Sequence, residues 1–225
     1  EDPFFANVYA SNDGRYELNT HFANKYSDKL SSLVLLHGNT RNIKNDMNND
    51  GFLDNPLGRQ LNVANRWQYS NPETGWVTFL NARYMRDEKQ TGELDFDPDR
   101  DKLTTNYWGS EIVTDRFDFS SKVGYVFKDM PYQSIGFQNA FTSHNQQSYF
   151  GLSQYKIKQN SYYSNLIFNS IINNTMHKFA TGLNFSLDNY QEFVSRKDWS
   201  RTDNSVGAFF EYTYDNDENF SLILG

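Results

Sequence analysis

The sequence predicts an all-β protein of the transmembrane antiparallel β-barrel class. Apolar and polar residues alternate with period two in segments of about ten residues, and polar connections of two lengths separate the segments. Aromatic residues make up 17% of the chain, although hydrophobic residues of all kinds make up only 37%. In a barrel strand every second residue meets lipid while the lumen and the loops are polar, so this composition is typical of a barrel. No stretch approaches the roughly 18 consecutive apolar residues of a membrane helix.

About ten segments are expected to be strands, and the alternation assigns their faces. The expected strands are 15–22, 30–38, 60–69, 76–85, 116–127, 133–143, 161–172, 178–187, 206–214 and 219–225. The lipid-facing positions are expected to include Phe117, Phe119, Val123, Leu183 and Phe185. The lumen-facing positions are expected to include Arg66, Arg83, Arg116, Lys122, Gln138 and Glu211, together with Lys178 and Asn184. In 30–38 both sides look apolar, so its faces stay unassigned.

The connections are expected to alternate strictly between short and long. Short turns are expected at 27–29, 70–74, 128–132, 173–174 and 215–218. Long polar loops are expected at 39–58, 86–106, 144–160 and 188–204. Outer-membrane barrels have short periplasmic turns and long extracellular loops, so the long loops are expected to face outside. Tyr and Trp residues near the strand ends are expected at the two membrane interfaces.

Composition and motifs exclude several classes of function. The chain has 225 residues, a net charge of −7 and no cysteine. A disulfide framework, a thiolate zinc site and a cysteine nucleophile are therefore excluded, and an acidic chain is poorly suited to nucleic acid. The four histidines, His21, His37, His144 and His177, show no metal-ligand spacing, and polar filling of a lumen is favoured for them. No catalytic residue is expected, and the protein is not expected to be an enzyme.

The first long loop contains a motif that predicts a calcium site. Its residues read D-x-N-x-D-G-x-x-D from Asp46 to Asp54. Oxygen ligands at alternate positions can surround one hard cation, and Gly51 permits a sharp turn between them. The expected ligands are Asp46, Asn48, Asp50, the carbonyl of Phe52, and Asp54. The alternative is a loop of ordinary turn formers, since the final bidentate Glu of an EF-hand is absent.

The second long loop carries many acidic residues among a few basic ones. It could bind a cation or steer a ligand, but a solvated mobile loop is the favoured interpretation. The chain ends at Leu222–Gly225 without a terminal aromatic residue and begins without a signal peptide. Residues 1–225 are therefore expected to form part of a single β-barrel domain that continues beyond this sequence.

Several stretches resemble TonB-dependent receptors of Bacteroidota, in the branch labelled vitamin B12 or iron-siderophore receptors. They are the hairpin Asn65–Tyr69 with Thr74–Trp76, the strand Asp115–Phe127, and the segments 133–136, 148–151, 170–172 and 208–212. The resemblance implies a barrel of 22 strands with a plugged lumen, of which this chain supplies about ten strands and no plug.

The resemblance also implies a function and partners. It implies active uptake of a scarce, bulky nutrient, such as a corrinoid or a ferric siderophore, across the outer membrane of a Gram-negative bacterium. The implied partners are the lipid bilayer, the TonB energy complex through an N-terminal part outside this chain, and a surface lipoprotein. Two alternatives stay open: a complete ten-stranded outer-membrane protease or lipase, and a surface adhesin. A hydrolase would need an Asp–His or Ser–His pair, and His144 is the histidine expected in a long loop.

Overall fold

The computed structural model describes residues 2–216 and 219–225, and these form a single antiparallel sheet. The strands are β1 (Phe4–Ala10), β2 (Arg15–Lys25), β3 (Leu30–Arg41), β4 (Leu57–Asn71), β5 (Trp76–Gly92), β6 (Gly109–Val126), β7 (Ser134–Phe150), β8 (Ser153–Ile172), β9 (Asn174–Val194), β10 (Lys197–Asp198), β11 (Arg201–Asp215) and β12 (Ser221–Leu224). The four-residue helix α1 (Pro98–Asp101) lies between β5 and β6. The predicted all-β antiparallel class is confirmed.

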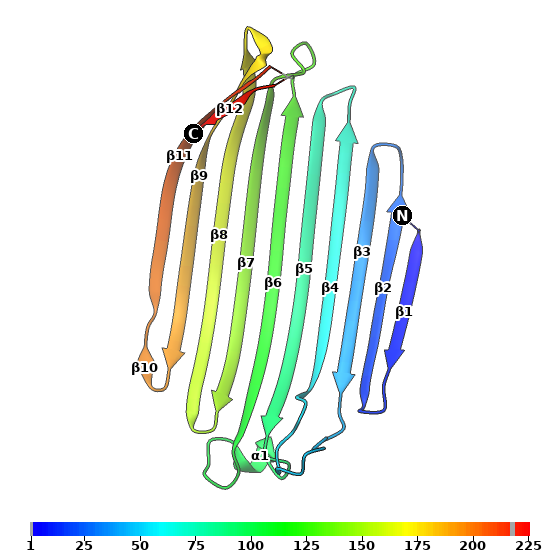
Figure 1. Cartoon of the computed structure of the whole chain (residues 1–225), viewed down its shortest axis with the longest axis vertical. Helices are drawn as coiled ribbons and strands as arrows, with labels where there is room; N and C mark the ends of the chain where they lie inside the picture. The colour runs from blue at the N-terminus through cyan, green and yellow to red at the C-terminus, as the bar shows by residue number, and fades with distance from the viewer. Residues whose placement is uncertain (1, 217–218) are drawn as a thin grey trace.

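The sheet follows the order of the chain. Each strand from β1 to β9 pairs with the next, then β9 pairs with β11 and β11 with β12, while the short β10 pairs with β9. Figure 1 shows the strands side by side in one layer, with the two termini toward opposite sides. In the described part of the chain no pairing joins β1 to β12, so the sheet is open. Such a meander places neighbouring strands in the order that an up-and-down barrel requires.

All ten expected strands exist, and two more accompany them. Strand β1 was not predicted, because Phe4 and Phe5 make both of its faces apolar at the start and so hide the alternation. Its register is regular, with Phe4 opposite Phe22 and Ala10 opposite Tyr16. The second addition, β10, is a two-residue pairing with the end of β9.

Two of the four segments that were expected to be long loops are mostly strand instead, so these two predictions are wrong. Residues 144–160 are the ends of β7 and β8 joined across a two-residue turn, and most of 188–204 belongs to β9, β10 and β11. Strands β8 and β9 have 20 and 21 residues, or about 65–70 Å at roughly 3.3 Å per residue. That is about twice the 9–11 residues a membrane-spanning strand needs. The alternation disappears in these extensions because they are polar on both sides, although the backbone ladder continues.

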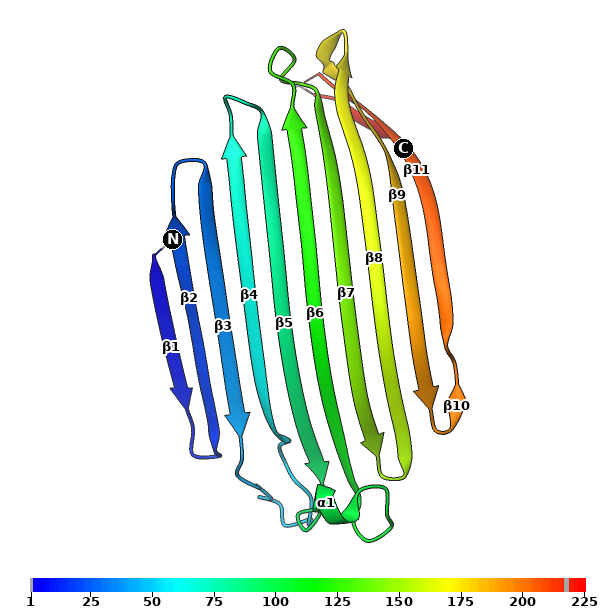
Figure 2. The ribbon, with the colours of Figure 1, turned by 180° about the vertical axis from the view of Figure 1, so that it is seen from behind.

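The connections nevertheless sort to two ends of the sheet. Figures 1 and 2 show the two long loops, 42–56 and 93–108, at the same end as the turns at 151–152 and 195–196. We call this the long-loop end. The turns at 26–29, 72–75, 127–133 and 173 lie at the opposite, short-turn end. The turn expected at 215–218 includes 217–218, which lie outside the described residues. Among the residues that the structure describes, no helix is long and apolar enough to cross a membrane.

Candidate functional site

The strand register divides the side chains of the sheet into two faces. Val123 of β6 lies opposite Phe137 of β7, which lies opposite Leu166 of β8, which lies opposite Leu183 of β9. Directly opposed residues in an antiparallel pair project to the same side. The same reasoning places Phe117, Phe119 and Phe185 with them. We call this side the apolar face.

The six residues expected to face a lumen share the other side, which we call the polar face. Lys122 lies opposite Gln138, and Arg83 lies opposite Asp118. Arg116 is two residues from Asp118 in the same strand, so it shares that face. Arg66 and Glu211 join the same side through β4 and β11. Lys178 and Asn184 follow from the register of β8 with β9. The predicted separation into two groups on opposite faces thus agrees with the register. That lipid meets one face and a lumen the other stays a prediction.

A continuous band of the apolar face carries no Asp, Glu, Lys or Arg. In the central strands the segments of this band pair with one another in register. They are 63–71, 76–84, 117–125, 135–143, 160–168, 181–189 and 202–210. Nine residues extend about 30 Å along a strand, or roughly 23 Å at a barrel tilt of about 40°. That height is close to the apolar belt of about 25 Å on outer-membrane barrels.

Aromatic and charged groups mark the two edges of this band. At the short-turn end Tyr26 stacks on Trp67 with ring centroids 5.5 Å apart, and Trp76 contacts Tyr125 at 5.0 Å. Amphipathic rings prefer a membrane interface, so this edge has the expected girdle. Toward the long-loop end the first charges on the apolar face of β4, β5 and β6 form one cluster. Its contacts are Arg59–Glu88 at 2.5 Å, Arg86–Glu88 at 2.7 Å, Arg86–Asp115 at 3.3 Å and Tyr84–Asp115 at 2.8 Å.

The polar face carries charges at the level of the same band. Arg116 donates to both oxygens of Asp118 at 2.9–3.0 Å, and the hydroxyl of Thr142 donates to the same carboxylate at 2.8 Å. Arg66 lies over the ring of Phe79 at 5.2 Å. Among the described residues neither Arg66 nor Lys122 forms an ion pair, so these cations are available to whatever occupies the space beside this face.

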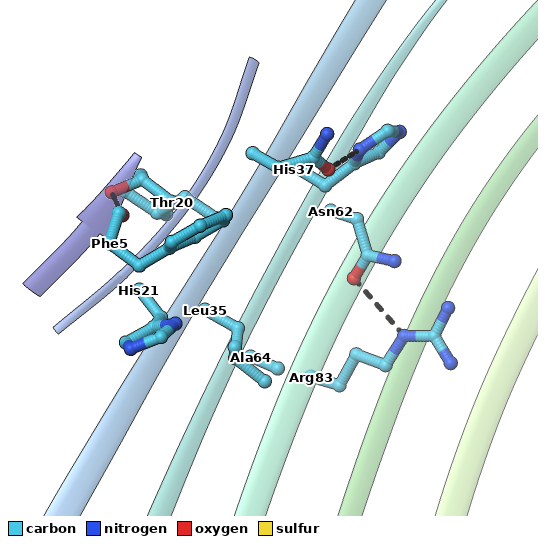
Figure 3. A pocket seen from close by; sticks show the side chains of 10 residues that line it. Phe5, Thr20, His21, Leu35, His37, Asn62, Ala64 and Arg83 are labelled. Carbon is cyan, nitrogen blue, oxygen red and sulfur yellow. Dashed lines mark hydrogen bonds between the residues drawn. The ribbon is translucent and has the colours of Figure 1, made fainter. Parts of the chain in front are cut away.

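One hollow on the polar face, of about 430 Å³, lies across β1 to β5 (Figure 3). Phe5, Leu35 and Ala64 supply apolar surface, while polar groups stand beside them. Asn19 Oδ1 lies 2.6 Å from His37 Nδ1, and Arg83 Nε donates to Asn62 Oδ1 at 3.1 Å. The ring of His21 stacks on Phe5 with centroids 5.5 Å apart. The sequence did not reveal this hollow, since Phe5 lies on the unpredicted β1 and the faces of 30–38 could not be assigned.

The five predicted calcium ligands lie in the loop 42–56, where the side-chain oxygens of four of them accept hydrogen bonds from backbone amides. Asp46 accepts from the N–H groups of Asp50 and Gly51 at 3.1 and 3.0 Å, and Asp50 accepts from that of Phe52 at 2.8 Å. The carboxylate of Asp54 accepts from the N–H of Met47 at 2.7 Å, and Asn48 donates to Asp50 at 2.9 Å. In the described chain no group of three or more His, Cys, Asp or Glu is placed to hold a metal. Calcium binding therefore stays a prediction.

The second long loop is partly buried, whereas a solvated mobile loop was the favoured interpretation of its sequence. Phe96 and Tyr149 are almost completely buried and their ring centroids lie 6.4 Å apart, beside Gly109, where any Cβ would meet the Phe96 ring. Asp101 is also buried, and it accepts two hydrogen bonds from Arg100 and one from the Asp97 N–H. The guanidinium of Arg100 lowers the pKa of Asp101 to about 2. Burial raises the pKa of Tyr149, and its hydroxyl donates to Glu111 at 2.8 Å.

The loops 42–56 and 93–108 also bind each other. Phe52 and Glu93 form an isolated β-bridge, the Leu94 N–H donates to the Gly51 carbonyl at 2.8 Å, and Lys44 donates to the Leu94 carbonyl. Leu53 is buried, and its N–H donates to the Gly92 carbonyl at 2.9 Å. The two loops form one ordered unit over the long-loop end, which sequence reasoning treated as two independent segments.

Comparison with known proteins gives one structural similarity. No protein-family model and no curated protein matches the chain. The fold is similar to that of the alcaligin outer-membrane receptor FauA from Bordetella pertussis, with a TM-score of 0.64 and 10% sequence identity. The match covers 92% of this chain and 34% of that receptor, so the chain spans about a third of the receptor's length. At this identity the similarity shows the fold, which is an antiparallel sheet of the outer-membrane β-barrel class.

Proposed function

We propose that this chain forms part of the barrel wall of a TonB-dependent transporter in the outer membrane of a Gram-negative bacterium. The observation that carries the proposal is the charge-free band on one face, matched in height to a bilayer, with Arg66, Lys122 and the Arg116–Asp118 pair on the other. In a soluble protein a charge-free face of a sheet is covered by a second layer, whereas the described residues form a single sheet with nothing over this face. The structural similarity to an outer-membrane receptor supports the same kind of protein.

In this proposal the apolar face meets lipid and the polar face lines the lumen. Arg66, Arg83, Arg116, Lys122, Gln138 and Glu211 form part of the lumenal wall. The remaining strands of a barrel of 22 and the plug come from outside this chain, as does the N-terminal contact with the TonB energy complex. The transported nutrient is scarce and bulky, such as a corrinoid or a ferric siderophore, and a surface lipoprotein is a further partner. The reaction is transport, so no bond of the nutrient changes.

The hydrolase alternative receives no support from His144. This histidine lies in β7, not in a loop, on the polar face opposite Arg116 and Gln159. Its Nδ1 is buried without a hydrogen-bond partner, and within the described residues no Ser or Asp donates to or accepts from it. A catalytic His needs a nucleophile within about 3 Å and a group that orients it. No observation in the described residues favours the adhesin.

Uptake by cells that lack the gene tests the proposal. Radiolabelled cyanocobalamin and a panel of ferric siderophores are supplied separately to wild-type, deletion and complemented strains. We expect the deletion strain to lose uptake of one nutrient class, and we expect a protonophore to abolish that uptake in the wild type, since TonB-dependent transport needs the inner-membrane proton gradient. Unchanged uptake of every nutrient after deletion would contradict the proposed substrate classes. Uptake that survives the protonophore would contradict TonB dependence.

A further inference from the structure

Most of the net negative charge of the chain lies in the two long loops. Residues 42–56 contain three acidic residues and one basic residue, and residues 93–108 contain five acidic residues and two basic ones. Together they carry a net charge of −5, out of −7 for the whole chain. The three basic residues are already engaged, since Arg100 pairs with Asp101, Lys102 with Glu111, and Lys44 donates to the Leu94 carbonyl. Carboxylates therefore outnumber cations on this surface, and those of Asp50, Asp54, Asp95 and Asp99 are exposed.

An exposed apolar cluster lies among these carboxylates. The rings of Phe52 and Trp108 lie 6.3 Å apart and both are more than 40% exposed. Gly151 packs so closely on the Trp108 indole that a Cβ there would lie 2.9 Å from its nitrogen, which places the neighbouring Leu152 beside the cluster. Leu152 is 62% exposed and Met47, on the same loop as Phe52, is 78% exposed. Scattered apolar residues on a surface need no explanation, but a contiguous group on ordered loops marks an interaction site.

The loops that carry this cluster are held in place before any partner arrives. The Phe52–Glu93 bridge joins them, Glu93 accepts from the Trp108 N–H at 2.7 Å, and Phe96 fixes the base of the second loop against Tyr149. A surface already ordered in this way loses little conformational entropy when it binds, which favours affinity. These contacts connect residues far apart in the sequence, so they belong to the fold and not to local turn propensity.

We propose that this surface, formed by residues 42–56, 93–108 and the turn 151–152, binds a cationic amphipathic polypeptide. Phe52, Trp108 and Leu152 contact apolar side chains of that partner. The exposed carboxylates of the same two loops attract its Lys and Arg residues; they are Asp50, Asp54, Asp95 and Asp99. Aromatic residues at the centre and charges at the rim are the usual arrangement of a protein interface. The site is separate from the polar face, so it does not depend on which nutrient is transported.

The chemistry of the surface selects this partner over two others. An anionic lipid headgroup or a free phosphate would meet repulsion from a net charge of −5. A divalent cation would be attracted, but it would leave Phe52, Trp108 and Leu152 exposed to water. A polypeptide with both positive charge and apolar side chains can pair with the carboxylates and also cover the exposed apolar side chains. Opposite charge also accelerates its association and makes binding weaken as salt rises.

Binding of a synthetic peptide to the full-length receptor in zwitterionic lipid nanodiscs tests the proposal. The probe is a fluorescein-labelled helix of Leu and Lys, and its matched controls replace every Lys by Glu or every Leu by Ser. Empty nanodiscs correct for partition into lipid, and a chelator keeps divalent cations out. We expect the Leu/Lys peptide alone to bind, with an affinity that falls as salt is added. Equal binding of the Leu/Glu peptide, or no binding of any peptide, would overturn the proposal.

Two variants locate the site on the receptor. Asp95→Asn with Asp99→Asn removes two exposed charges, and neither side chain makes a hydrogen bond in the structure, so folding is preserved. We expect this variant to weaken binding of the Leu/Lys peptide by about 2- to 30-fold, as two rim charges worth about 0.2–1 kcal/mol each imply. Leu152→Ser should weaken binding of the peptide as well, whereas Asp129→Asn, at the short-turn end, should leave binding unchanged. If the double variant and Asp129→Asn bind alike, the surface proposed here is not the site.

Discussion

Val123 and Lys122 are neighbours in the sequence but project to opposite faces at the middle of the sheet. Val123 lies between Thr78 and Phe137 in the charge-free band, and Lys122 lies between Phe79 and Gln138 on the polar face. In the full-length receptor Val123→Arg should lower the free energy of unfolding by about 2–4 kcal/mol, because it places a cation near the bilayer midplane. Lys122→Gln should cost far less. Denaturant titration in lipid vesicles measures both, and spin labels showing equal access to water at 122 and 123 would contradict the two faces.

Asp101 holds the second long loop through its charge. Arg100 and the backbone of Asp97 donate to it, and its pKa of about 2 lies below the roughly 3.9 of an unfolded Asp. The loop is therefore stabilised by the ionised form at every pH above about 4, and the contribution is lost as the pH falls toward 2. Hydrogen exchange of residues 93–108, corrected for intrinsic rates, should rise over that interval. Asp101→Asn should raise it already at pH 7, whereas exposed Asp99→Asn should not. Equal exchange in the two variants would exclude this role.

Asp50 is the residue on which the predicted calcium site depends most. Asp46, Asn48, Asp50 and Asp54 already lie in one turn of chain, but their oxygens bind amides and would have to turn toward an ion. Calcium added to the intact receptor should protect residues 40–58 from proteolysis, with a dissociation constant on the order of 10⁻⁴–10⁻³ M because the bidentate Glu is missing. Asp50→Ala should abolish the protection, and Asp95→Asn in the other loop should not. Identical cleavage in chelator and in calcium would mean that the motif is only a turn.

At the scale of single strands, the sequence predicted those elements in which one side is apolar and the other polar. In β6 the alternation of Phe117, Phe119 and Val123 with Arg116 and Lys122 placed the strand and assigned both faces, because the period of two reflects a difference between two environments. Strand β1 could not be found in this way, since Phe4 and Phe5 are both apolar. The faces of β3 were undetermined for the same reason, with Leu33, Val34, Leu35 and Leu36 in succession.

The ends of β7, β8 and β9 could not be predicted from the sequence. Polar residues lie on both sides of these extensions, so apolar and polar residues no longer alternate, although the backbone pairing continues. The register persists without interruption from Gln146–Ile157 to Phe150–Ser153, and from Asp188–Asp203 to Tyr190–Arg201. The amides of these extensions are therefore hydrogen-bonded like those of the charge-free band. The packing of Phe96 on Tyr149 was equally hidden, since 52 intervening residues separate them and no periodicity connects a loop to a distant strand.

The extended hairpins lead to a prediction for hydrogen exchange. In the full-length receptor, amides that donate in the ladder within 144–160 and 188–194 should exchange slowly, because opening them breaks a paired strand. The amides of 42–45, outside any strand, should exchange faster and serve as the internal comparison. Exchange mass spectrometry resolves these peptides. Fast exchange throughout 144–160 would contradict the extended hairpin and support the long loop that the sequence predicted there.

At the scale of the whole molecule, charge is distributed along the axis of the strands. The apolar band excludes charge, and the polar face at the same level carries cations such as Arg66 and Lys122, which form no ion pair among the described residues. The two long loops hold five of the seven net negative charges. Each region suits a different neighbour: lipid, the contents of a lumen, and a cationic partner outside.

The open sheet leads to the last prediction. Strands β1 and β12 each pair on one side only within the described chain, so each leaves a row of unpaired N–H and C=O groups. In lipid every unpaired group costs several kilocalories per mole, and only closed barrels avoid that cost. The 225 residues expressed alone should therefore fail to form a heat-modifiable barrel in detergent, whereas the full-length receptor should migrate faster before boiling than after. Co-expression with the rest of the barrel as a second polypeptide should restore the shift, because the edges then find partners. A monomeric, cooperatively folded product of the 225 residues would instead favour a small complete barrel.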